Sequence, residues 1–308
     1  MSAAAPDSHP DRFRADLVLL LACLGWASTF AIVKSALDSA SPNAFLAARF
    51  TLGTLVAALV ARRSLRDLPS LKAGAILGLF LWVGFALGTW GLRYTTATRS
   101  GFITSLCVVL VPVLGFLVFR QRVPACAWAG AALAAAGLTV LSAPALTAGG
   151  SLLGDGLTVA SAVAYAFHLL LISRFAPRVI PSAAVTAQLA VVAVLSALSL
   201  PFEDIRFELT PALAGTLVFT GVCASALFLF MQLWAQARTS AVRAALIFSL
   251  EPLLAALFAR ALLADPLQPE VWQGGALILF GILVVELWPR LAIRRRAAAS
   301  PANPEGLP

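Results

Sequence analysis

Apolar stretches of membrane-spanning length follow one another along almost the whole chain of 308 residues. A bilayer core about 30 Å thick is crossed by about 20 largely apolar residues in a helix. Inside that core every backbone N–H and C=O needs a partner within the protein, which restricts spanning structures to helices and closed barrels. Stretches of this length are typical of helices, so the sequence predicts an all-α integral membrane protein.

Ten stretches are expected to cross the bilayer. They are 16–36, 43–61, 71–92, 100–119, 125–143, 155–173, 181–200, 211–235, 241–262 and 269–288. Hydrophobic residues make up 60% of the chain and charged residues 12%, compared with about 45–50% and 25% in soluble domains. This composition leaves little chain for a separate soluble domain.

The positions of Lys and Arg predict the orientation. With both termini in the cytoplasm, that side holds most of the 22 basic residues, as the positive-inside rule requires. The remaining basic residues are Lys34, Arg93, Arg99, Arg206 and Arg260 on the other side and Arg49 within the membrane. The net charge of +8 is explained by this topology and gives no reason to expect a nucleic-acid partner. A cleaved secretory signal is not expected, and the predicted location is the inner or plasma membrane of the cell.

The chain contains an internal repeat. In the first half of each copy, Asp16, Trp26, Pro42 and Arg49 precede Asp155, Tyr165, Pro181 and Gln188 by 139 residues. In the second half, the matched residues are Ser100, Leu106 and Pro112 with Ser240, Leu246 and Pro252, at an offset of 140, and Trp128, Gly130 and Gly137 with Trp272, Gly274 and Gly281, at an offset of 144. An extra helical turn in the second copy would account for the change of offset.

Each copy has five expected helices, so the second copy enters the membrane upside down relative to the first. Inverted repeats of this kind are typical of secondary transporters, in which exchange of the two conformations opens a central site to alternate sides. The expected domains are a cytoplasmic tail at 1–15, a first five-helix repeat at 16–145, a second at 153–290 and a basic, disordered cytoplasmic tail at 291–308.

Several short runs carry a resemblance to a known family. They are G-W-A-S-T-F at 25–30, A-A-R-F at 47–50, T-T-A-T-R-S-G-F-I-T at 95–104, R-T-S-A-V-R-A-A-L at 238–246, S-L-E-P at 249–252 and W-x-G at 128–130 and 272–274. Because of the order and repetition of these runs, the chain resembles the drug/metabolite transporter superfamily, and within it the EamA-type ten-helix permeases.

The resemblance implies that helices 1–4 and 6–9 surround a central cavity and that helices 5 and 10 are peripheral. It also implies a secondary active transporter, with export as the expected direction, for small organic metabolites such as amino acids or drug-like compounds. Alternating access would then be coupled to protons or to exchange. We retain two alternatives from other classes, an integral-membrane enzyme and a sensor or channel without alternating access.

Ionisable groups inside a bilayer are expensive, by about 2.5–3.5 kcal/mol for a central charge on insertion scales, so each needs an explanation. Glu251, which precedes Pro252, is interpreted as a proton-coupling or cation-binding group facing the cavity. The alternatives are a permanently protonated carboxyl and an acid paired with a base for packing. His168 is the second proton-coupling candidate because histidine titrates near neutral pH. A neutral histidine bonded across helices is the alternative.

The other candidates for the substrate cavity are polar or aromatic. Arg49 offers a planar fork of donors for a substrate carboxylate, or it reaches the membrane interface along its aliphatic stem. Gln188 is its repeat counterpart and offers a neutral hydrogen bond. Trp26 and Tyr165 occupy matching positions and would clamp a flat or apolar solute, or pack in the core, and Trp82 is a further cavity candidate.

The sequence contains no pattern for a catalytic site, a cofactor or a metal. Cys23, Cys107, Cys126 and Cys223 lack metal-ligand spacing, and no paired acids suggest catalysis, so an enzyme is not expected. The expected partners are a small-molecule substrate, the lipid bilayer and protons. The G-x-x-x-G of Gly74 and Gly78 and the recurring glycines of helices 5 and 10 are interpreted as helix packing within the chain, with a homodimer contact as the alternative.

Overall fold

The computed structural model describes residues 9–147, 151–255, 257 and 269–299. These residues form helices and connecting turns, and the one strand-like feature among them is an isolated antiparallel bridge between Ala40 and Phe207. The prediction of an all-α fold is therefore confirmed. The expected tail at 1–15 and the expected helix at 241–262, with Arg260, lie partly outside the described residues.

The first half of the chain contains seven α-helices and a short 3₁₀ turn. They are α1 (His9–Ala27), α2 (Thr29–Ala36), α3 (Pro42–Ala61), η1 (Ser64–Arg66), α4 (Leu68–Tyr94), α5 (Ala97–Ser105), α6 (Cys107–Leu117) and α7 (Ala125–Thr147). The pairs α1–α2 and α5–α6 each replace one expected spanning helix, because the chain breaks within it.

The second half repeats this order. It contains α8 (Leu152–Phe175), η2 (Ala176–Arg178), α9 (Pro181–Leu198), η3 (Leu200–Phe202), α10 (Pro211–Val218), η4 (Phe219–Leu227), α11 (Phe228–Gln236), α12 (Ala241–Phe248), helical residues 251–255 and α14 (Pro269–Ala299). The segment η4 is a π-helix that joins α10 to α11 in one continuous span. Helix α14 continues past residue 290, where the sequence suggests a disordered tail.

Seven of the helical segments in the described part of the chain are long and apolar enough to cross a membrane. Shorter apolar segments at Ala125–Leu141 in α7 and Pro269–Val285 in α14 add two more. Helix α12 and residues 251–255 are the described part of the expected span at 241–262. Together these elements match the ten expected spans and confirm a multi-span membrane protein.

Side-chain caps explain where several helices begin. Thr96, Ser151, Thr210 and Ser240 each precede a helix and accept a hydrogen bond from the backbone N–H three residues later. This arrangement satisfies one of the N–H groups that a helix leaves free in its first turn. These caps thus define where the four helices begin.

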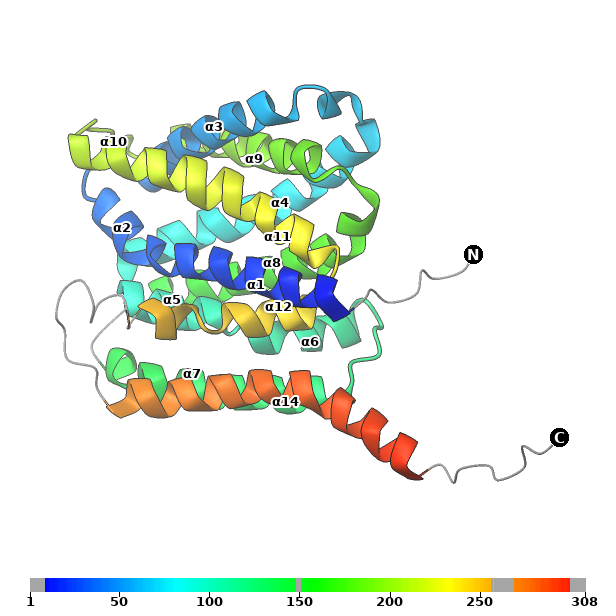
Figure 1. Ribbon diagram of the computed structural model, residues 1–308. Helices are drawn as coiled ribbons and strands as arrows, with labels where there is room; N and C mark the ends of the chain where they lie inside the picture. The colour runs from blue at the N-terminus through cyan, green and yellow to red at the C-terminus, as the bar shows by residue number, and fades with distance from the viewer. Residues whose placement is uncertain (1–8, 148–150, 256, 258–268, 300–308) are drawn as a thin grey trace.

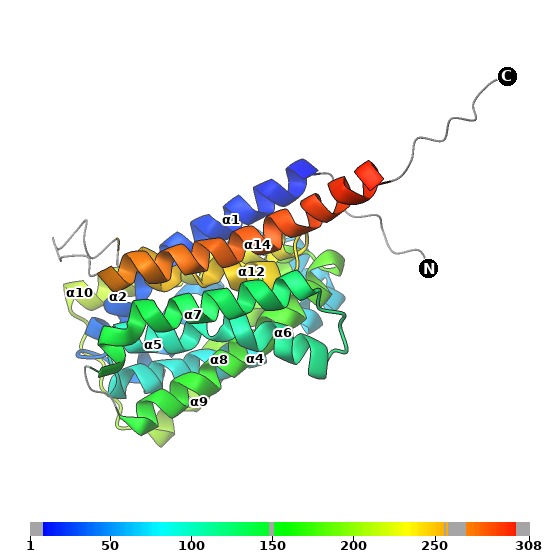
Figure 2. The same cartoon turned by 90° about the horizontal axis from the view of Figure 1, so that it is seen from below.

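Matching helices of the two repeats pack against each other. Helix α3 packs on α9, its counterpart, and α7 packs on α14, while α4 packs on α8 as α1 packs on α11. Figure 1 shows α7 and α14 side by side along one edge of the bundle, and Figure 2, seen from that edge, shows them beside each other and in front of the remaining helices. The bundle therefore has the pseudo-two-fold arrangement expected of inverted repeats, with α7 and α14 at the periphery.

Glycines permit this close packing. A Cβ atom on Gly78 in α4 would lie 2.8 Å from the carbonyl oxygen of Gln188, and one on Gly221 in η4 would lie 2.8 Å from the carbonyl oxygen of Arg49. In the peripheral pair, a Cβ on Gly130 would lie 2.8 Å from the Gly281 oxygen, and one on Gly281 would lie 2.7 Å from the Gly130 oxygen. All of these contacts are within the chain, as the packing interpretation requires.

The structure corrects the repeat register in one region. Helix α5 follows Thr96 as α12 follows Ser240, an offset of 144 residues, whereas the sequence match of Ser100 with Ser240 gives 140. Arg49 and Gln188 match at an offset of 139. Gly78 and Gly221, which contact the carbonyls of Gln188 and Arg49 in the same way, match at an offset of 143. The stretch between Gln188 and Gly221 contains the long connection from α9 to α10. The extra residues therefore lie in this loop rather than in an additional helical turn. Pro112 and Pro252 do not occupy equivalent positions.

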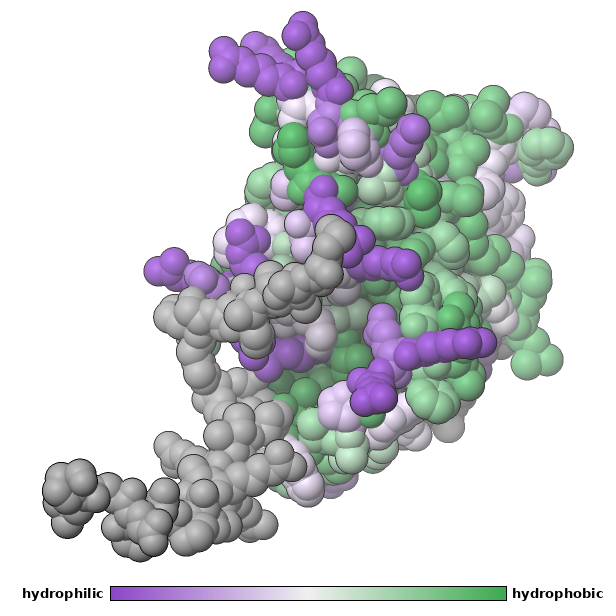
Figure 3. All heavy atoms as spheres, turned by 90° about the vertical axis from the view of Figure 1, so that its right-hand side faces the viewer, coloured by the Kyte–Doolittle hydropathy of each residue, from purple (hydrophilic) through white to green (hydrophobic). Residues whose placement is uncertain are grey.

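The two ends of the bundle differ in the number of basic residues that they carry. Helix α1 begins and α14 ends at the same end, which we call the terminal face; the other end is the opposite face. Figure 3 views the terminal face and shows hydrophilic side chains gathered there. Basic residues at the helix ends of this face are Arg12, Arg14, Arg62, Arg63, Arg66, Lys72, Arg120, Arg122, Arg174, Arg178, Arg238 and Arg243.

Candidate functional site: a central cavity between broken helices

Three spanning segments that surround the centre of the bundle break in mid-course. Helix α1 gives way to α2 at Ser28, α5 to α6 at Leu106, and α12 ends at Phe248 before helical residues 251–255. Pro252 has no N–H to offer the carbonyl of Phe248, which accounts for the last break. Broken helices at membrane depth are typical of transport sites.

Hydroxyl groups satisfy the backbone beside these breaks. Ser28 Oγ donates to the Gly25 carbonyl at 2.8 Å, and Thr29 Oγ1 donates to the Trp26 carbonyl at 2.8 Å. Ser105 donates to the Gly101 carbonyl at 2.8 Å, and Ser249 to the Leu246 carbonyl at 2.6 Å. These bonds partner carbonyls at each break, so an irregular backbone is tolerated where it borders a cavity.

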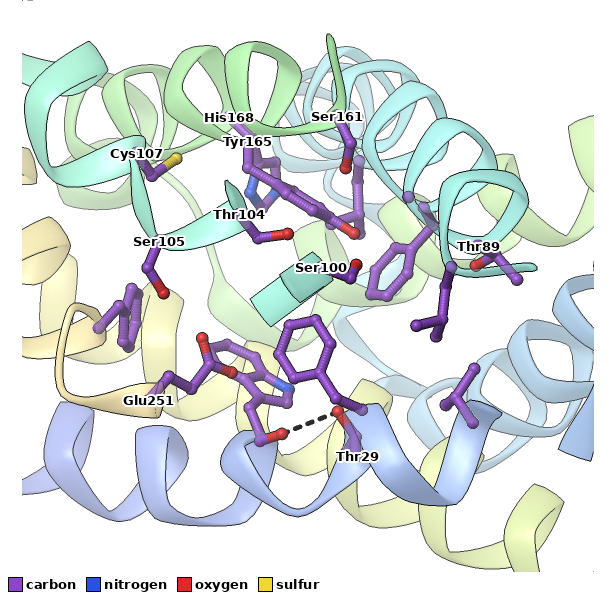
Figure 4. Close-up of a pocket in the computed structure, with 18 of the residues that line it drawn as sticks. Thr29, Thr89, Ser100, Thr104, Ser105, Cys107, Ser161, Tyr165, His168 and Glu251 are labelled. Carbon is purple, nitrogen blue, oxygen red and sulfur yellow. Dashed lines mark hydrogen bonds between the residues drawn. The ribbon is translucent and has the colours of Figure 1, made fainter. Parts of the chain in front are cut away.

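A cavity of about 160 Å³ lies between the breaks (Figure 4). Five of the seven residues predicted for the cavity line it: Trp26, Arg49, Tyr165, His168 and Glu251. The remaining walls are mainly apolar and hydroxyl side chains, among them Phe30, Leu81, Phe85, Thr104, Ser105, Cys107, Ser161 and Phe248. The cavity thus has a few polar groups in a largely apolar wall, as small-molecule sites do.

Glu251 is half-buried and lies across the cavity from Tyr165 and His168 (Figure 4). Among the residues that the structure describes, its carboxylate has no hydrogen bond or ion pair. The described residues therefore do not form the contact that the packing alternative requires, in which a base or a neighbouring helix holds this acid. The carboxylate thus borders the cavity without a partner in the described part of the chain.

Arg49 is 3% exposed and does not reach the membrane interface. Its Nε donates to Ser225 Oγ at 3.0 Å, and its guanidinium carbon lies 5.0 Å from the ring centre of Phe50 and 4.8 Å from that of Phe85. No carboxylate in the described part of the chain lies within ion-pair distance of it. Aromatic faces offset part of the cost of burying this charge, and the rest favours an anionic group in the cavity.

His168 and Gln188 form one unit. The His168 Nε2 and Gln188 Oε1 atoms lie 2.9 Å apart, and both side chains are buried. Gln188 does not line the cavity but holds the ring of His168, which does. Trp82 also lies outside the cavity wall, and its Nε1 has no hydrogen-bond partner among the described residues.

Trp26 and Tyr165 face the cavity from α1 and α8, each with an aromatic neighbour. The ring of Trp26 lies edge-on to Phe228, with centroids 6.1 Å apart, and its Nε1 donates to the Ala224 carbonyl at 2.8 Å. Tyr165 lies edge-on to Phe85 at 5.6 Å.

Two ion pairs near the cavity are absent from our sequence predictions. Arg243 in α12 contacts Asp16 in α1 at 2.5 Å, and Arg99 in α5 contacts Asp155 in α8 at 2.5 Å. A signal was present in the sequence, since T-T-A-T-R at 95–99 and T-S-A-V-R at 239–243 repeat at an offset of 144. Among the described residues, no group of three His, Cys, Asp or Glu side chains forms a metal site.

The chain resembles known transporters over nearly its whole length. The sequence model of the EamA-like transporter family matches residues 13–143 and 152–287. An uncharacterized transporter of Archaeoglobus fulgidus is 35% identical over 281 residues, which cover 90% of this chain and 87% of that protein. The uncharacterized transporter YwfM of Bacillus subtilis is 27% identical and covers 89% of this chain and 94% of its own.

A solved structure shares the fold. It superposes with a TM-score of 0.75 at 22% identity and covers 91% of this chain and 98% of its own. At this level of identity the likeness concerns the arrangement of helices and not the solute.

Proposed function

Since the chain belongs to the EamA-like transporter family, we propose that it is a secondary active carrier that exports small amino-acid-like solutes across the cell membrane. Its two repeats would open the cavity alternately to the two sides. The broken helices around the cavity and the packing of matching helices support this reaction class over a channel or an enzyme.

The observation that carries the solute class is a pair of charges in one cavity, the Glu251 carboxylate and the Arg49 guanidinium, neither of which has an ion-pair partner in the described part of the chain. A molecule with an ammonium and a carboxylate group would match both charges. Its side chain would contact the apolar wall that contains Phe30 and Phe248. Arg49 would hold the carboxylate through the guanidinium nitrogens that Ser225 does not occupy.

Glu251 is the proposed coupling group. A carboxylate in a low-dielectric cavity, with no partner among the described residues, would take either a proton or a substrate cation. Binding of the ammonium group would displace the proton, and arrival of a proton from the other side would release the solute. Export would then be driven by proton entry, with His168 close enough to the same cavity to assist proton transfer.

The proposed orientation has both termini in the cytoplasm. It is supported by the basic residues at the terminal face, since cytoplasmic loops of membrane proteins carry an excess of Lys and Arg. The same residues would interact with the anionic lipids of the cytoplasmic leaflet.

Counterflow in proteoliposomes tests the proposal with three solutes that share one ring. Phenylalanine carries both charges, phenethylamine only the ammonium and 3-phenylpropionate only the carboxylate. We expect saturable counterflow of phenylalanine and at least about tenfold lower kcat/KM for the other two, the loss expected when one buried charge of the site is left unpaired. Equal transport of phenethylamine would replace the amino-acid class by organic cations. Absence of counterflow for all three would overturn the solute class, and a single-channel current would overturn the carrier.

A further inference from the structure

The two ion pairs have the same construction in the two repeats. Each joins an acid near the start of a repeat's first helix to an Arg in the third position of a half-helix from the other repeat. In each pair a threonine four residues before the Arg also donates to the acid. Thr95 donates to Asp155 at 3.2 Å and Thr239 to Asp16 at 3.5 Å.

The two pairs lie at opposite faces of the bundle. Helices α1 and α12 both begin at the terminal face, and α8 and α5 both begin at the opposite face (Figure 1). Each pair thus joins two helices that run in the same direction: α1 with α12 at the terminal face, and α8 with α5 at the opposite face. Both pairs cross from one repeat to the other, so neither repeat can separate from its partner at a face without breaking the pair there.

The half-helices connect these pairs to the cavity. Helix α5 carries Arg99 near its start and cavity-lining Thr104 and Ser105 at its end, beside the break at Leu106. Helix α12 carries Arg243 near its start and cavity-lining Phe248 at its end. Because each half-helix ends at a break, it can tilt without carrying the rest of its span, and a solute against its inner end would alter the position of its outer end.

The pairs are partly exposed. The side chains of Arg99 and Asp155 are 18% and 17% exposed, and those of Arg243 and Asp16 are 25% and 24% exposed. Ion pairs with access to solvent contribute little, and the median of measured values is about 0–1 kcal/mol. Contacts of this strength can form and break in each transport cycle.

We propose that Asp16–Arg243 and Asp155–Arg99 are paired gate latches. Each restrains the separation of the two repeats at one face, and both pairs are formed in this structure. This inference rests on the proposed carrier function. The latch at one face opens when the half-helix bearing its Arg tilts at its break, while the latch at the other face stays formed.

Side-selective labelling tests the latches without measuring transport. In a variant whose four cysteines are replaced by alanine, Thr104→Cys places a thiol in the cavity. Its reaction with a membrane-impermeant maleimide is followed in intact cells and in inside-out vesicles, which present opposite faces. Asp16→Asn is expected to raise the labelling rate in one preparation and Asp155→Asn in the other, each by about threefold to fivefold, the shift that loss of a partly exposed ion pair produces.

Two controls separate gating from damage. Asp38→Asn neutralises an exposed acid at the opposite face that belongs to neither pair, and it is expected to leave both rates unchanged. The double exchange Asp16→Arg with Arg243→Asp is expected to restore slow labelling. The proposal is overturned if each neutralisation changes the two preparations equally, or changes neither. Side-selective labelling with no counterflow would retain the latches and reject the solute class, whereas counterflow without side-selectivity would do the reverse.

Discussion

The two repeats agree closely in the residues that pack and in the ion pairs that join them, and they differ in the polar residues of the cavity. Trp26 meets Phe228 edge-on as Tyr165 meets Phe85, with centroids 6.1 and 5.6 Å apart. A Cβ atom on Gly78 in the first repeat, or on Gly221 in the second, would lie 2.8 Å from a backbone carbonyl oxygen of the other repeat. This matched scaffold gives the molecule two nearly equivalent arrangements, which a carrier exchanges.

The polar groups of the cavity have no such match. The unmatched positions are Arg49 against Gln188, His168 against Thr29 and Glu251 against Cys107. In each of these pairs one member carries an acidic or basic group and the other is neutral near pH 7. The comparison indicates that symmetry supplies the motion, and that departures from it orient the solute. The following predictions address the two parts in turn.

The largest effect is expected from breaking the matched scaffold. Gly221→Leu places a side chain 2.8 Å from the Arg49 carbonyl, a backbone atom that cannot move without α3. Overpacking of this kind costs about 1–3 kcal/mol or more, and we expect a lowered thermal midpoint and loss of monodisperse protein after detergent extraction. Gly215→Leu is the matched control, since a Cβ there has no atom within 4 Å. Equal behaviour of the two variants would contradict the role of the close contact.

The next effect is expected from the charge that has no counterpart. Glu251→Gln removes the proposed partner of the ammonium group, and kcat/KM for phenylalanine should fall by about 30-fold, the lower end for truncating a buried charge pair. The pH-gradient dependence of transport should disappear with it. Cys107→Ala, at the matching position, should remain within about threefold because no charge is lost. Retention of pH-driven transport in Glu251→Gln would assign the proton to another group, with His168 the next to test.

A smaller and more selective effect is expected when the asymmetry itself is removed. Arg49→Gln gives both repeats glutamine at this position. The preference for phenylalanine over phenethylamine should fall by about tenfold, since one charge-assisted hydrogen bond contributes about 1.5 kcal/mol, while transport of phenethylamine changes little. The measurement is the ratio of the two kcat/KM values in proteoliposomes. An unchanged ratio would show that Arg49 stabilises packing and does not bind the carboxylate.

Apolar length was enough to predict the spans and the fold class, because the bilayer imposes helices of a fixed length. The inverted repeat followed from residues matched at similar offsets and from the odd number of spans in each copy. Side-chain orientation was not predictable, since in helices that are apolar all round periodicity does not identify the inward face. Trp26 and Trp82 were therefore predicted alike, and only Trp26 lines the cavity. Arg49 left two interpretations open until its contacts with Ser225 and two phenylalanine rings were known.

The ion pairs show a different limit. Asp16 and Arg243 are 227 residues apart in sequence, and their contact depends on which helices of opposite repeats become neighbours. The repeated T-T-A-T-R and T-S-A-V-R runs marked both half-helix starts, but the register of 140 residues concealed their equivalence.

The π-helix η4 holds more residues in its turns than an α-helix does. Deletion of a single residue from Phe219–Leu227 would restore α-helical winding and leave the residues that follow nearly in phase. Leu229 and Gln232 would therefore stay in the cavity wall. Ala224 and Ser225, which accept hydrogen bonds from Trp26 and Arg49, lie within the segment and would change position. A one-codon deletion here would thus disturb the supports of two cavity residues while it preserves the wall beyond them.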